Sequence, residues 1–211
     1  MAQALPKLLT FEEFLEWYPE DGRRYELIEG EIVEIRPVGT HEFIASFIDA
    51  ELTLEIRRLQ LPYLSSRNTL GKPNRPGSAD LPNVIVLDRE AVGVDPYWEQ
   101  FSTISAGSSA QLVVEVVSTN WQDDYLRKLA DYETLGIPEY WIVDYLGLGA
   151  TRYIGKPKQP TISVYQLVEG EYQLRQFRGA KQVISAIFPD LALTAAQVFQ
   201  RKQLSGETSC S

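Results

Sequence analysis

Helices are predicted in four parts of the chain, mainly from the spacing of apolar side chains. Between residues 42 and 60 these side chains are three and four positions apart, which predicts a long amphipathic helix with Thr40 as its N-cap. Residues 10–13 have the form of a capping box, so a short helix should run to about residue 18. Further helices are expected at residues 123–135, ending before Gly136, and at residues 194–202.

Two β-hairpins are predicted, one near each end of the chain. In each, two strand-like segments are separated by residues that favour a turn, Glu29 and Gly30 in the first and Glu-Gly-Glu in the second. The paired segments are residues 25–28 with 31–35, and residues 161–168 with 172–177.

The middle of the chain contains the strands expected to form the core. Residues 81–87 have almost no polar interior, as a central strand covered on both faces would. Residues 111–117 are a second buried strand with one charge in its middle, and residues 139–144 are a third core strand. A further strand should open at residues 63–65, a loop covers residues 71–77, and residues 88–110 form an insertion with little periodicity. Strands alternating with helices predict an α/β protein, with a single domain at residues 1–204 and a flexible tail at residues 205–211.

Composition favours one globular domain inside the cell. The 211 residues suit a single domain, and 44% hydrophobic residues can fill a sizeable core. No apolar run approaches the ~18 residues of a membrane span, and the first residues lack the pattern of a signal peptide. The only cysteine, Cys210, is in the polar tail, which fits a reducing cytoplasm, the expected location.

The net charge of −9 argues against indiscriminate binding to nucleic acid, because proteins that coat phosphate backbones usually carry a basic surplus. Any contact with DNA should therefore be local. Ordinary solvated charges are the alternative interpretation of the basic residues. Two candidate basic patches are Arg67 with Lys72 and Arg75, and Arg152 with Lys156 and Lys158.

Glu115 is the first residue that suggests chemistry. Valines flank it on both sides, and a charge in such a strand is costly unless it is paired or binds a cation. It could bridge to a basic side chain, or it could bind Mg²⁺ or Mn²⁺ together with the adjacent backbone carbonyl. Asp80 and Asn83 open the preceding buried strand and could add an oxygen ligand, or they could simply form a turn.

The predicted helix at residues 123–135 carries Asp124, Lys128 and Tyr132 at positions i, i+4 and i+8, on one face. Aromatic and leucine side chains lie near that face, which should direct it towards the sheet. We therefore predict that the Lys128 ammonium lies in one cavity with Glu115 and points at its carboxylate. A solvated Asp–Lys pair is the alternative. His41, the only histidine, could contact a phosphate, polarise a water or cap a helix.

Several ordered motifs resemble one large bacterial family. They are YELIEGEIVE, LPNVIVLD, LVVEVVS, a D-x-x-x-K-x-x-x-Y helix and GIPEYWIVD, and they span about residues 11–177. The chain resembles restriction-endonuclease-like proteins, a branch of the PD-(D/E)XK nuclease superfamily. The resemblance implies a restriction-endonuclease-like central mixed β-sheet flanked by helices, and Mg²⁺-dependent hydrolysis of DNA phosphodiesters.

Carried over from the family, Glu115 matches the acidic metal ligand and the Val116 carbonyl matches the usual backbone ligand. Val117 occupies the position of the motif lysine, and in this branch the lysine looks to have moved to Lys128. Further family positions with less defined roles are matched by Glu26, His41 and Tyr132.

The chain departs from the family at Asn83, which stands where the family has an aspartate. Asp80 can take over only if a loop or bulge redirects it, because an odd offset along an ideal strand points to the opposite face. The expected catalytic residues are thus Asp80, Glu115 and Lys128. The expected metal ligands are Asp80, Glu115 and the Val116 carbonyl, with Lys128 orienting or deprotonating the attacking water.

Two other functions remain open. A degenerate nuclease fold that binds nucleic acid or a partner without cutting is favoured by Asn83 and by the acidic net charge. An interaction module whose terminal hairpin mediates homodimerisation is the second, and a homodimer is expected. Binding of Mg²⁺ or Mn²⁺ at Glu115 would separate the nuclease from both.

Overall fold

The computed structural model describes residues 8–36 and 38–200. The predicted tail at residues 205–211, with Cys210, lies outside the described residues. The closing helix predicted at residues 194–202 is described as α7 (Ala195–Gln200), and its last two predicted residues also lie outside the described residues.

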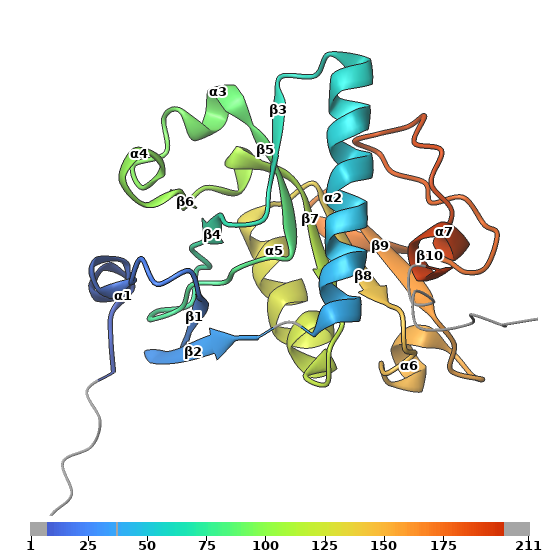
Figure 1. The fold of residues 1–211 in the computed structure, drawn as a ribbon, viewed down its shortest axis with the longest axis horizontal. Helices are drawn as coiled ribbons and strands as arrows, with labels where there is room; N and C mark the ends of the chain where they lie inside the picture. Colours follow the sequence, from blue (N-terminus) through green and yellow to red (C-terminus); the bar gives the residue numbers. More distant parts are fainter. Residues whose placement is uncertain (1–7, 37, 201–211) are drawn as a thin grey trace, which may run out of the picture.

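A six-stranded mixed sheet forms the centre of the molecule (Figure 1). Strands β7 and β8 are parallel, and every other neighbouring pair is antiparallel. The predicted central mixed sheet is therefore confirmed, with the C-terminal hairpin forming one of its edges. The strands, in spatial order, are β10 (Glu171–Phe177), β9 (Thr161–Val168), β8 (Glu139–Asp144), β7 (Ala110–Val116), β5 (Val84–Asp88) and β3 (Tyr63–Ser66).

The N-terminal hairpin is a separate two-stranded sheet, made of β1 (Arg24–Ile28) and β2 (Glu31–Ile35). Glu29 and Gly30 both have positive φ, the backbone that suits a tight hairpin turn. The hairpin is joined to the segment before β5 by a bridge between Leu27 and Ala79. Helix α1 (Phe11–Trp17) precedes it, and both hydrogen bonds of the predicted capping box are present.

Helix α2 (Gly39–Leu59) covers one face of the sheet (Figure 1). Ile44, Ile48 and Leu52 recur at spacings of four on this helix and are fully buried in the core cluster beneath it. The prediction of Thr40 as N-cap is wrong. The helix begins at Gly39, so Thr40 already has helical backbone, and the N-cap is Val38 with no side-chain cap bond.

The opposite face is covered by the helix predicted at residues 123–135. Its first half, η2 (Asp123–Lys128), is a π-helix, and its second half is α5 (Leu129–Leu135). Gly136 ends it with a left-handed backbone, as a C-terminal glycine commonly does. A π-helical turn is wider than an α-turn and is often found at functional sites.

Strand β5 begins at Val84, later than the predicted residue 81, and Asp80 forms an isolated bridge with Gly71. Residues 81–83 therefore lie outside the sheet's ladder. The predicted insertion contains short elements held by the buried Asp95, whose carboxylate accepts hydrogen bonds from the Ser105 and Ala106 amides. The elements of the insertion are α3 (Arg89–Val92), α4 (Trp98–Phe101), β6 (Thr103–Ile104) and η1 (Gly107–Ser109). Strand β4 (Leu70–Gly71) pairs with β6, and a short helix, α6 (Thr151–Ile154), follows β8.

Within the described ranges, no helix combines the length and the apolar character needed to cross a membrane.

Candidate active site

A cavity of about 470 Å³ lies between the β1–β2 hairpin, the six-stranded sheet and the helices α2 and η2. It is lined by β1 and β2 of the hairpin, the start of α2, the end of β7, the turns that follow β7 and β8, and η2. Two larger hollows, of about 720 and 710 Å³, adjoin α1 and are lined by none of the buried charged residues described below.

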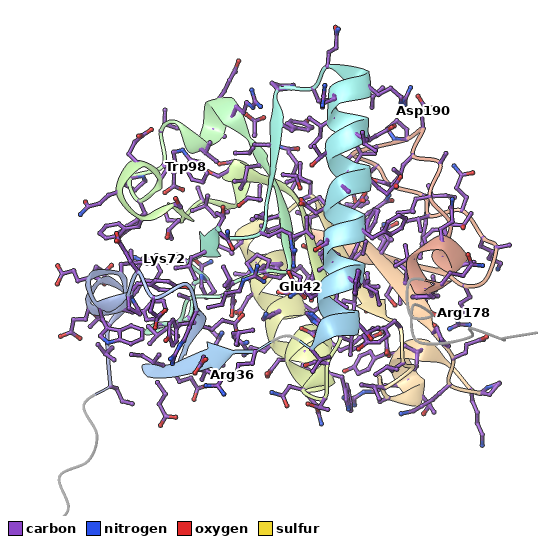
Figure 2. The ribbon with its side chains drawn as sticks, in the orientation of Figure 1. Arg36, Glu42, Lys72, Trp98, Arg178 and Asp190 are labelled. Carbon is purple, nitrogen blue, oxygen red and sulfur yellow. The ribbon has the colours of Figure 1, made fainter. Side chains whose placement is uncertain are left out.

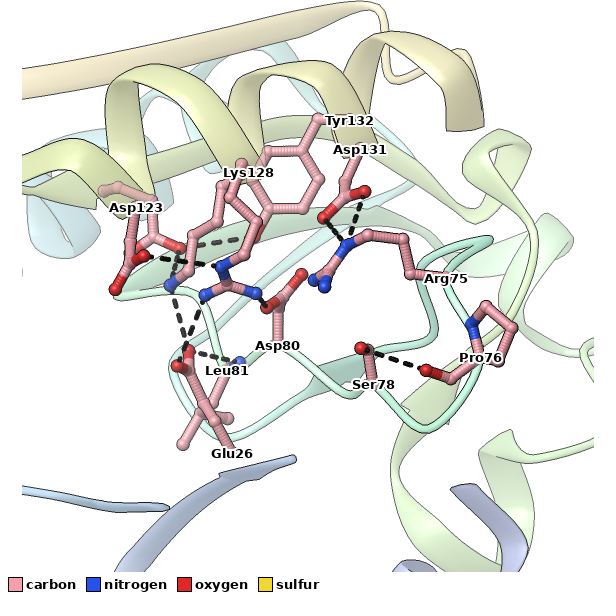
Figure 3. Close-up of polar contacts among 12 residues, drawn as sticks. Glu26, Arg75, Pro76, Ser78, Asp80, Leu81, Asp123, Lys128, Asp131 and Tyr132 are labelled. Carbon is pink, nitrogen blue, oxygen red and sulfur yellow. Dashed lines mark hydrogen bonds and ion pairs between the residues drawn. The ribbon is translucent and has the colours of Figure 1, made fainter. Parts of the chain in front are cut away.

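Glu115 and Lys128 meet in this cavity, as predicted. Figure 3 shows the Lys128 side chain reaching from its helix towards Glu26. The Lys128 Nζ lies 2.8 Å from Glu115 Oε1, and both side chains are almost fully buried. The Tyr132 hydroxyl donates to the same Glu115 oxygen at 3.2 Å. The face at positions i, i+4 and i+8 thus points at the sheet, although half of the helix is π-helical.

Glu26 completes this cluster from strand β1. Its Oε1 lies 2.9 Å from Lys128 Nζ and also accepts a hydrogen bond from the Leu81 amide at 3.0 Å. The sequence predicted a supporting role for Glu26, but its partners are 102 and 55 residues away in the chain. Lys128 is therefore an ammonium held between two carboxylates.

The electrostatics of the pair follow from burial and proximity. Burial raises the pKa of Glu115, and the Lys128 charge opposes that shift. Burial alone would lower the pKa of Lys128, but Glu115 and Glu26 outweigh it and hold that pKa well above its usual value. Lys128 is consequently charged at neutral pH and acts as a hydrogen-bond donor.

Asp80 is fully buried and is paired with Arg127, whose Nη1 donates to Asp80 Oδ1 at 2.7 Å. Asp80 does not line the cavity. Arg127 also approaches Glu26 Oε2, at 3.9 Å, and Asp123 Oδ1, at 3.6 Å. Sequence analysis missed Arg127, and the only local signal was its i, i+4 spacing from Asp123.

Asn83 and His41 engage the two sides of the Val116 peptide. The Val116 amide donates to Asn83 Oδ1 at 2.7 Å, and His41 Nε2 donates to the Val116 carbonyl at 2.8 Å. Nε2 therefore carries a proton, and burial lowers the pKa of His41, which favours the neutral form of the ring. A carbonyl oxygen has two lone pairs, so the Val116 carbonyl can still accept a second contact.

Asp124 lines the same cavity and is 7% exposed. Burial, followed by the nearby charge of Glu115, raises its pKa well above the usual value. Its backbone carbonyl accepts from the Tyr140 hydroxyl, but no hydrogen bond or ion pair from the described residues reaches its carboxylate.

Of the basic residues grouped by sequence as a first patch, Lys72 and Arg75 line one hollow beside α1, whereas Arg67 does not. Arg67 pairs with Glu42, Lys72 with Glu12, and Arg75 with Asp131. Glu42 lies at the start of α2 and Lys72 lies beside α1, on separate parts of the molecule (Figure 2). In the second group, Arg152 lies 4.7 Å over the Tyr153 ring and Lys158 donates to the Leu148 carbonyl.

The donors around the cavity are of the kind that a hard divalent cation prefers, namely carboxylate and carbonyl oxygens. Glu26, Glu115, Asp124 and the Val116 carbonyl supply them. In the described part of the chain, no three His, Cys, Asp or Glu side chains stand together as a ready-made metal cage. A Mg²⁺ site commonly uses one or two carboxylates and takes its other ligands from water and phosphate, so the residues fit such an ion.

The sheet, its flanking helices and the carboxylate–lysine cluster at the end of β7 define a restriction-endonuclease-like α/β protein. The same fold is found in the crystal structure of "a putative nuclease belonging to DUF820 from Anabaena variabilis ATCC 29413", which superposes with a TM-score of 0.68. The two sequences are 18% identical, and the match covers 92% of this chain and 98% of the other.

The family model Uma2, described as "putative restriction endonuclease", matches residues 11–196. The chain belongs to this family, which confirms the resemblance found in the sequence motifs. No curated protein matches the chain.

Proposed function

We propose that this protein is a divalent-metal-dependent endonuclease that hydrolyses phosphodiester bonds of DNA. The observation that carries the proposal is the buried contact between Glu115 and Lys128 in a cavity that also contains the Val116 peptide. Membership of a family described as "putative restriction endonuclease" supports the nuclease class. DNA as substrate and Mg²⁺ or Mn²⁺ as cofactor are parts of the proposal.

Glu115 and the Val116 carbonyl would hold the metal ion. When bound, the ion would polarise the scissile phosphate and offset negative charge on the leaving oxygen. His41 keeps the Val116 carbonyl in place from one side, and Asn83 keeps the Val116 amide in place from the other. Asp80, the other predicted ligand, would first have to leave Arg127.

Lys128 would act as a charged donor. Because Glu115 and Glu26 raise its pKa, it is a poor proton acceptor, so it would orient the attacking water and stabilise negative charge in the transition state. Glu26 and Tyr132 would position Lys128 and Glu115, respectively. Of the two roles predicted for Lys128, orientation of the water is thus the one that the electrostatics support.

The test is plasmid nicking by purified wild type and Glu115→Gln in the presence of Mn²⁺. The variant keeps the shape of the side chain and removes its charge, so nicking should fall about 100-fold or more, the scale of losing one electrostatic contact in a transition state. Glu34→Gln is the matched control, because Glu34 lines the same cavity but pairs with Arg36 at its rim. Equal nicking by wild type and Glu115→Gln would assign the activity to another site or to a contaminant.

A degenerate, non-cutting fold is the second candidate. Two observations favour it. Asn83, which stands where the family has an aspartate, binds the Val116 amide, and Asp80 is paired with Arg127. DNA binding by wild type without any nicking in Mn²⁺ would establish this function instead.

We also propose a homodimer formed through the β9–β10 hairpin. Strand β10 is an edge strand whose outer backbone groups have no neighbouring strand in the described chain, and edges of this kind can pair with another chain. Leu174 on β10 and Val168 at the end of β9 are large apolar side chains that are 44% and 42% exposed.

A further inference from the structure

Asp124 is a carboxylate without a partner in an enclosed place. It lies in the π-helical turn η2, is 7% exposed, and lines the cavity that contains Glu115 and Lys128. No donor or cation among the described residues contacts its oxygens. A buried carboxylate is costly unless it is paired or binds a cation, which makes Asp124 a candidate ligand for a cation in the cavity.

The other acidic side chains near the cavity are already engaged. Asp80 is bound to Arg127 Nη1 at 2.7 Å and lies outside the cavity wall. Asp123, the neighbour of Asp124, is 3.6 Å from Arg127 Nε, and its side chain is 42% exposed. Asp124 is therefore the carboxylate in this region that remains available inside the cavity.

The charges inside the cavity also call for a divalent ion. Glu26, Glu115 and Asp124 carry three negative charges when ionised, and Lys128 carries one positive charge. The sum of −3 and +1 is −2. Asp123 also lines the cavity, and together with Asp80 and their shared partner Arg127 it adds −2 and +1, so the total is −3 and a divalent cation would offset most of it.

We propose that Asp124 provides the second carboxylate of the metal site, in place of the aspartate that the family has at Asn83. The ligand would then come from the helix instead of the strand. Asp124 and Lys128 are four residues apart in η2, so one turn of the helix would supply both an anionic metal ligand and the ammonium. This inference rests on the proposed function and assigns a residue to its metal site.

The experiment is direct Mn²⁺ binding, measured from the free-ion EPR signal, with wild type, Asp124→Asn, Asp123→Asn and Asp80→Asn. Asp124→Asn should weaken binding at least about tenfold, the lower end of what losing even a supporting group costs a metal site. Asp123→Asn removes the same charge one residue away and should leave binding nearly unchanged. Asp80→Asn should also retain binding.

Thermal unfolding gives a second readout that does not depend on activity. A bound ion stabilises the folded protein, so Mn²⁺ should raise the Tm of wild type and Asp123→Asn but not that of Asp124→Asn. Because Asp124→Asn breaks no hydrogen bond of the described residues, its Tm without metal should not fall.

The outcomes separate this inference from the proposed function. Wild-type affinity in Asp124→Asn, together with lost binding in Glu115→Gln, would overturn the role of Asp124 and leave the metal site itself standing. Lost binding in Asp80→Asn but not in Asp124→Asn would assign the ligand to Asp80. Absence of Mn²⁺ binding by wild type would overturn both the inference and the proposed metal dependence.

Discussion

At the residue scale, the site depends on a few side chains that bind backbone atoms. The Val116 peptide follows Glu115 directly, and it is held by Asn83 at its amide and by His41 at its carbonyl. The position of Glu115 is thus set partly by two side chains that come from distant parts of the chain. Asn83 stands where the family has an aspartate. In this fold its side chain accepts a hydrogen bond from the Val116 amide, which lies beyond the last paired residues of β5 and β7.

His41 should make stability depend on pH. Burial lowers its pKa in the folded protein, so between its ordinary pKa of about 6.5 and that lower value the unfolded chain binds a proton that the folded protein does not. Stability from this residue is therefore lost as pH falls below about 6.5. Glu115 and Asp124 act in the opposite direction, because their pKa values are raised.

The comparison of wild type with His41→Gln isolates this effect, because the carboxylates are common to both proteins. Glutamine keeps an N–H donor for the Val116 carbonyl and does not titrate. The free energy of unfolding of wild type relative to the variant should decrease from pH 7 to pH 5, with a limiting slope of about 1.4 kcal/mol per pH unit. Urea titrations at pH 5, 6 and 7 measure the free energy of unfolding of both proteins. If this free energy changes with pH in the same way in both, the prediction is contradicted.

At the element scale, the helix made of η2 and α5 positions most of the candidate site. It carries Asp124, Lys128 and Tyr132, and it is supported at its far end by the insertion between β5 and β7. Gly107, in η1 of that insertion, lies against the backbone of Leu135, the last residue of α5. A Cβ at Gly107 would overlap the Leu135 carbonyl, so this contact requires glycine.

Gly107→Ala should accordingly destabilise the protein by about 1–3 kcal/mol or more, the usual cost of overpacking. The displaced backbone belongs to α5, so the variant should also weaken the contact of Tyr132 with Glu115. Gly93→Ala is the control, because its added Cβ would meet only ordinary contacts near Glu90 and Arg89. The urea concentration at the midpoint of unfolding measures the difference between the two variants. Equal midpoints would show that the insertion moves away from α5 without loss of stability.

At the scale of the whole molecule, the chain is acidic, with a net charge of −9, and nine basic side chains of the described residues are paired with carboxylates. A protein of this kind gains little from general attraction to phosphate backbones. Binding to DNA would therefore depend on the metal ion and on the shape of the cavity, and a dimer would add a second site along the same duplex.

The proposed homodimer predicts a change in mass for one substitution. Leu174→Lys places a charge on the exposed edge strand β10 and should convert a dimer into a monomer, as measured by size-exclusion chromatography with light scattering. Val94→Lys is the control, since Val94 is 84% exposed in the insertion, far along the chain from the hairpin. A wild-type protein that is already monomeric would exclude the dimer.

The sequence by itself determined the features that depend on near neighbours. The capping box at Thr10, the hairpin turn at Glu29 and Gly30, and the apolar central strands all follow from local backbone preferences and burial. The approach of Lys128 to Glu115 was also predictable from the sequence, because a helix that directly follows a strand packs its apolar face on the sheet, and Lys128 lies on that face.

Only the tertiary structure decided the partners that come from far along the chain. Arg127 binds Asp80 across 47 residues, His41 binds Val116 across 75, and Glu26 binds Lys128 across 102. Such pairs leave no trace in local periodicity, because periodicity reports which face is buried and not what it meets. The π-helical turn of η2 is decided in the same way, since a change in backbone hydrogen bonding leaves the order of apolar and polar residues unaltered.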